Sequence, residues 1–109
     1  MQARVVVAAG AVQPQIDAWL ADHAQGARAI VAEGVFTAIE VPPSVAVARI
    51  AAGCVCCLGR TPLRVTLLRT LRASRADQLL LVLSSADHLD RVRALLTDGS
   101  MGVRFALEG

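Results

Sequence analysis

The chain has 109 residues and a net charge of +2 at pH 7. This length suits one domain, and an apolar fraction of 55% excludes a disordered chain. All eleven basic residues are arginine. The lack of lysine excludes Schiff-base catalysis, the phosphate-binding lysine of a P-loop and the Lys–Glu pair of a kinase.

The charge is unevenly distributed along the chain. Between Val41 and Ala76 there are six arginines and no acidic residue, whereas the remaining residues carry five arginines and nine acids. This asymmetry favours either an anionic partner or a solvated arginine face. No aromatic residue lies among the arginines from Arg60 to Arg75, so a base-stacking nucleic-acid surface is not expected.

Compartment and membrane contact are predicted from three features. No run approaches the ~20 apolar residues of a membrane span. The apolar run near the N-terminus is broken by Gly10, Gln13 and Pro14, which makes it too short and too polar for a signal peptide. The three cysteines are an odd number within four positions and cannot form a disulfide framework. We therefore expect a cytoplasmic protein with no membrane partner.

Strand and helix signals alternate in the first half of the chain. Residues 4–8 predict a buried strand. Pro14 opens a helix, and Gly26 ends it. Residues 27–32 predict a second strand that ends at Glu33 and Gly34, and 35–39 predict an extended segment before Pro42-Pro43. Residues 45–50 predict a third strand.

The alternation continues in the second half. Thr61 and Pro62 predict the start of a helix with a leucine stripe at Leu63, Leu67, Leu68 and Leu71. Asp77 begins a turn before a very apolar strand at 78–83. Ser84 or Ser85 is expected to cap a third helix, which buries Leu89, Val92, Leu95 and Leu96 and ends at Gly99. Residues 103–107 predict the last strand.

This order of elements predicts an α/β fold over residues 1–109. We expect a small three-layer domain with a mostly parallel sheet of four to five strands.

The motif Gly53-Cys54-Val55-Cys56-Cys57 contains every cysteine of the chain, between a predicted strand and a predicted helix. Thiolates are soft ligands for Zn²⁺ and similar ions. The three cysteines leave one tetrahedral position for water, His88, His23 or a group from another chain. The alternative is that they are small, buried apolar residues.

The motif GCVCC, the following helix and the strand that begins Asp77-Gln78-Leu79-Leu80-Leu81 resemble the CobW-type family of P-loop GTPases. In that family a serine follows the corresponding strand, and Ser84 falls on it. The stretch from Ile30 to Gly34 is similar to the family's V-I-x-N-E-x-G motif, shortened by one residue. The likeness spans roughly residues 29–99. It implies a P-loop-NTPase-like fold and a role in zinc or cobalt trafficking.

The nucleotide site of that family is missing. After the first strand the chain reads AAGAVQPQ (8–15), with no G-K-[ST] sequence. Val82 and Ala32 replace an acidic residue and an asparagine of the family motifs, and no N-K-x-D-type motif for base recognition is present. We therefore expect no bound nucleotide and no GTPase activity.

Other chemistry-bearing residues have simpler interpretations. Ser84-Ser85 beside Asp87-His88 contains the letters of a catalytic triad, but helix capping explains it better. Glu33 and Glu40 are interpreted as solvated loop carboxylates, and His23 as a packed or surface residue.

The favoured hypothesis is a non-enzymatic CobW-like domain that binds a divalent transition metal through Cys54, Cys56 and Cys57, with His88 as a possible fourth ligand. The alternatives are a protein-interaction module and a divergent GTP-binding protein. A homodimer is expected because a small parallel sheet leaves an edge uncovered, and a metalloprotein is a further possible partner.

Overall fold

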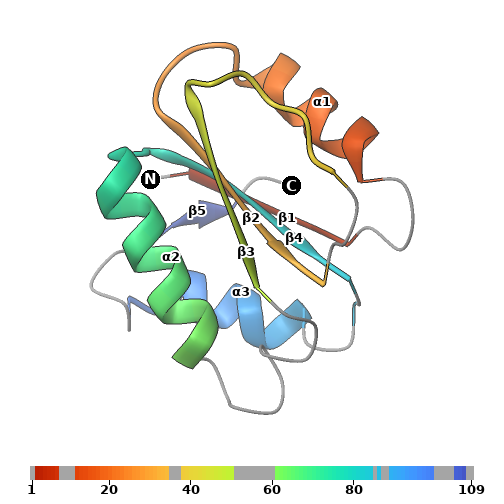
Figure 1. Cartoon of the computed structure of the whole chain (residues 1–109). Helices are drawn as coiled ribbons and strands as arrows, with labels where there is room; N and C mark the ends of the chain where they lie inside the picture. Colours follow the sequence, from red (N-terminus) through yellow and green to blue (C-terminus); the bar gives the residue numbers. More distant parts are fainter. Residues whose placement is uncertain are drawn as a thin grey trace.

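Five parallel strands lie between helices on both faces of the sheet (Figure 1). The computed structural model describes residues 2–7, 12–34, 38–50, 61–84, 86, 89–99 and 105–107. In these ranges the strands are β1 (Gln2–Val7), β2 (Arg28–Glu33), β3 (Val45–Ile50), β4 (Gln78–Leu83) and β5 (Ala106–Leu107). The helices are α1 (Gln13–Asp22), α2 (Thr61–Ser74) and α3 (Leu89–Thr97). The predicted α/β class is confirmed.

The strand order is β3-β2-β4-β1-β5. From β1 the chain passes to β2 and then β3 toward one edge of the sheet, and β4 and β5 return toward the other edge. Right-handed crossovers place connections that run in opposite directions on opposite faces. Accordingly, α1 lies on one face, and α2 and α3 lie on the other (Figure 1). This topology is of the Rossmann or P-loop type.

Each face of the sheet has its own apolar core. On the α1 face, Ile16 and Trp19 pack with Leu80 and Val82 of β4. Ile39 and Val41, from the connection between β2 and β3, extend this cover. Because consecutive strand residues point to opposite faces, the neighbouring leucines of β4 face the other helices.

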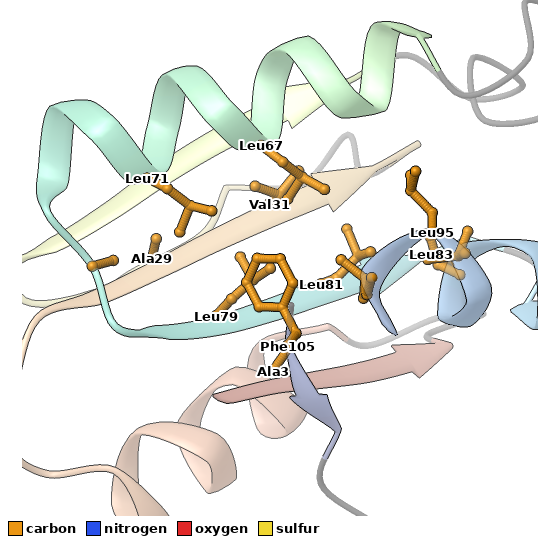
Figure 2. Packing of buried hydrophobic residues seen from close by; sticks show 13 residues of the cluster. Ala3, Ala29, Val31, Leu67, Leu71, Leu79, Leu81, Leu83, Leu95 and Phe105 are labelled. Atoms are coloured by element: carbon orange, nitrogen blue, oxygen red, sulfur yellow. The ribbon is translucent and has the colours of Figure 1, made fainter. Parts of the chain in front are cut away.

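The second core lies under α2 and α3 (Figure 2). Leu67 and Leu71 of α2 lie over Ala29 and Val31 of β2 in Figure 2. The remaining buried side chains of this cluster are Ala3, Ala76, Leu79, Leu81, Leu83, Val92, Leu95, Leu96 and Phe105. Both faces of β2 and β4 are therefore buried, which explains why these two strands are almost continuously apolar.

Several predicted boundaries differ from the structure. The third helix begins at Leu89, five positions after Ser84, so Ser84 does not cap it; Ser85 lies outside the described residues. Of the predicted extended segment 35–39, only residues 38 and 39 are described, and they belong to neither helix nor strand. The last strand covers two residues, Ala106–Leu107. By contrast, β3 and β4 have the predicted bounds.

The chain is compact, with a radius of gyration of 12.6 Å. Among the described helices, none combines the length and the hydropathy that crossing a bilayer requires.

Candidate functional site

The carboxyl ends of β1, β2, β3 and β4 lie side by side at one end of the sheet, which we call the carboxyl edge. Val7 pairs in register with Leu83, and Glu33 pairs with Ile50. The chain leaves β1 toward α1 on one face and leaves the neighbouring β4 toward α3 on the other. In open parallel sheets, ligands bind at the carboxyl edge where adjacent strands diverge in this way. This edge is therefore the candidate site.

A buried carboxylate lies at this edge. Glu33 is the last residue of β2, and it is only 5% exposed. The Ser84 hydroxyl lies 2.9 and 2.8 Å from the two carboxylate oxygens, and its backbone N–H lies 3.4 Å from one of them. One hydroxyl donates a single proton, which the two oxygens share. The hydroxyl is thus the main donor to a carboxylate that has lost most of its water.

The Glu33–Ser84 contact corrects two predictions. Ser84 is not a helix cap, because its hydroxyl binds Glu33 across the sheet edge. Glu33 is not a solvated loop carboxylate, because it ends a strand whose other residues are also mostly buried. Glu40 is exposed as expected, and its backbone N–H and C=O bind the side-chain amide of Gln13 at 2.9 and 2.7 Å. The sequence signal that could have indicated an inward carboxylate is the alternation of Ala29, Val31 and Glu33 along one face of the strand.

The predicted metal ligands Cys54, Cys56, Cys57 and His88 lie outside the described residues. Their segments, however, continue directly from this edge. Residues 51–60 follow Ile50, whose C=O accepts a hydrogen bond from the Gly34 N–H at 3.0 Å. Residues 85–88 follow Ser84. Within the described ranges, no group of three or more His, Cys, Asp or Glu side chains is arranged to hold a metal ion.

His23 lies at the opposite end of the sheet. It follows the last turn of α1, and its C=O accepts a hydrogen bond from Arg28 at the start of β2 at 3.0 Å. The His23 ring is buried, with Nδ1 2.9 Å from the Trp19 carbonyl oxygen and the two ring centroids 5.0 Å apart. The interpretation of His23 as a packed residue is confirmed.

The described arginines of the basic segment lie on the surface. Arg49 on β3, Arg69 and Arg72 on α2, and Arg75 after α2 are all exposed. They do not converge on the Glu33–Ser84 contact, which receives no guanidinium hydrogen bond from this set. The side chains of the four described arginines are therefore exposed, and whether they have a partner is a separate question.

Comparisons with models of known families, with curated proteins and with solved structures find no significant match. The resemblance carried by GCVCC and by the residues around Glu33 and Ser84 therefore rests on the sequence.

Proposed function

We propose that the chain binds a divalent transition metal, zinc or cobalt, through Cys54, Cys56 and Cys57, with His88 as the fourth ligand. One observation carries this proposal. Glu33 pairs in register with Ile50 and accepts a hydrogen bond from Ser84. Residues 51–60, which contain the cysteines, follow Ile50, and residues 85–88, which contain His88, follow Ser84. The two segments therefore begin on either side of the buried Glu33.

Chain length supports His88 over His23. Neighbouring strands lie about 4.8 Å apart, so Ile50 and Leu83, on either side of Glu33, are about 10 Å apart. Cys54 is four residues beyond Ile50 and His88 is five beyond Leu83. These lengths span at most about 14 and 18 Å, which allows Cys54 and His88 to reach a common point. His23 lies beyond the other end of a six-residue strand, about 20 Å away. It is also already held against Trp19.

The chemistry of the donors favours zinc and cobalt. Three thiolates and one imidazole form a closed tetrahedral set of the kind found in structural zinc sites. A model thiol has a pKa of about 8.5, so metal binding at pH 7 releases protons. Four protein ligands would hold the ion and leave no coordination position open for a substrate. Such a site agrees with metal trafficking or sensing rather than with catalysis.

Zinc titration of the reduced protein against a chromophoric chelator tests the proposal. We expect one Zn²⁺ per chain, and Co²⁺ should give thiolate charge-transfer and tetrahedral d–d absorption. Loss of outer-shell partners already weakens metal sites about 10–100-fold, so loss of a direct ligand should weaken binding by more than about 100-fold. We expect this for Cys56→Ala and for His88→Gln, while the matched control His23→Gln leaves binding unchanged.

Two results would overturn this function. Reduced protein that binds neither Zn²⁺ nor Co²⁺ at micromolar concentration rules out the site, and the interaction-module hypothesis replaces it. Equal effects of His88→Gln and His23→Gln rule out His88 as the ligand.

Calorimetry with Mg-GTP, for which no binding tighter than millimolar is expected, separates the metal hypothesis from a divergent GTP-binding protein. Light scattering with and without Zn²⁺ tests whether a homodimer completes the metal shell.

A further inference from the structure

Helix α2 has a second face that the sheet does not cover. Leu67 and Leu71 point into the core, and Leu68 is partly buried at the margin of that core. A stripe at helical spacing that includes Leu68 lines a groove of about 570 Å³. Among the described residues the groove is lined by Val65, Leu68, Arg69, Arg72 and Ala73, which we call the α2 outer face. Val65 is 46% exposed and is the one large hydrophobic residue of the described chain with this exposure.

In the described part of the chain, no acidic side chain pairs with the arginines of this face. Arg69 and Arg72 are both exposed, and neither makes a hydrogen bond or ion pair with any part of the chain that the structure describes. No acidic residue occurs anywhere in α2. Two uncompensated guanidinium groups next to an exposed valine are therefore available to a ligand with both acidic and apolar groups.

We propose that the α2 outer face docks an acidic amphipathic helix of another protein. Such a helix presents apolar side chains at i, i+3, i+4 and i+7, which match the spacing of the stripe. Its Asp and Glu residues would pair with Arg69 and Arg72, because guanidinium groups bind carboxylates through two parallel hydrogen bonds. This inference rests on residues 65–73 of α2 and uses no residue of the proposed metal site.

Charge and shape select this partner over the other candidates. A second copy docked on this face by two-fold symmetry would bring two basic patches together, which costs free energy. A nucleic acid would leave Val65 without an apolar contact, and the face offers no aromatic residue for stacking. An anionic membrane surface requires a broad apolar face to insert, but the broad apolar face of α2 is occupied by the core.

The test uses two fluorescent helical peptides with Leu at the a and d positions. One carries Glu at the flanking positions, and the other carries Gln there. We expect micromolar binding of the Glu peptide, weakening as NaCl rises from 50 to 500 mM. The double variant Arg69→Gln/Arg72→Gln should weaken binding about 10-fold, and Val65→Ser several-fold. The matched control Arg91→Gln/Arg93→Gln, which removes two exposed arginines of α3, should leave binding unchanged.

Several outcomes would overturn the docking site. These are no peptide binding up to 1 mM, equal affinity for the Glu and Gln peptides, or equal losses in the α2 and α3 double variants. Tighter binding of duplex RNA or phosphatidylserine vesicles than of the Glu peptide would assign the face to those ligands instead. Amide chemical shifts that move outside residues 65–73 would place the peptide elsewhere.

Discussion

Replacing Ser84 with alanine tests how much the buried carboxylate depends on its hydroxyl partner. Glu33 is 5% exposed, and the hydroxyl distances of 2.8 and 2.9 Å are within the range of normal hydrogen bonds. The other donor among the described residues, the Ser84 N–H, is 3.4 Å away and contributes little. Hydrogen bonds to charged groups contribute about 1.5–3 kcal/mol. We therefore expect Ser84→Ala to lower the free energy of unfolding by about 1.5–3 kcal/mol. Each kcal/mol lost lowers the Tm by about 4–8 °C.

Urea unfolding followed by tryptophan fluorescence measures the effect. Trp19 is the sole tryptophan and is fully buried, so its emission reports the loss of the core. The matched control is Ser74→Ala, because Ser74 is also half-buried but its hydroxyl only binds the Thr70 carbonyl of its own helix at 2.7 Å. This control should change stability by less than about 0.5 kcal/mol.

A double-mutant cycle with Glu33→Gln isolates the pair. If the hydroxyl stabilises the carboxylate, the two substitutions should be non-additive by at least about 1 kcal/mol. Equal effects of Ser84→Ala and Ser74→Ala on the free energy of unfolding, or additive effects of Ser84→Ala and Glu33→Gln, would contradict a stabilising Glu33–Ser84 hydrogen bond.

Two further predictions use the same unfolding assay. Leu67→Ala should lower the free energy of unfolding by about 2–5 kcal/mol because Leu67 is fully buried under α2. Val65→Ala on the outer face should lower it by less than about 0.5 kcal/mol. Similar losses for the two variants would contradict the assignment of the two faces. Arg75→Gly should raise stability by about 0.5–1 kcal/mol, because Arg75 follows α2 with a φ of 53°, a conformation that glycine adopts without strain. A destabilised Arg75→Gly variant would show that the arginine makes a compensating contact.

Local pattern was sufficient for the element types and for several boundaries. The bounds of β3 and β4 were predicted correctly because each strand is a short, mostly apolar run that begins within two residues of a turn signal. The signal is Pro42-Pro43 before β3 and Asp77 before β4. The buried side of α3 at Val92, Leu95 and Leu96 follows from its helical period. The parallel sheet follows from the alternation of strands and helices, since parallel neighbours need crossover connections.

The strand order and the Glu33–Ser84 contact were decided only by the tertiary structure. Placing β4 between β1 and β2 pairs residues more than forty positions apart, and no local propensity encodes such a choice. Ser84 was expected to be a cap because serine before a helix is the local signal for one. In the folded chain the ends of β2 and β4 are neighbours, and a carboxylate that is buried there needs a donor. Leaving a buried carboxylate without a hydrogen bond costs more free energy than losing a helix cap. Ser84 therefore binds Glu33 instead of capping α3.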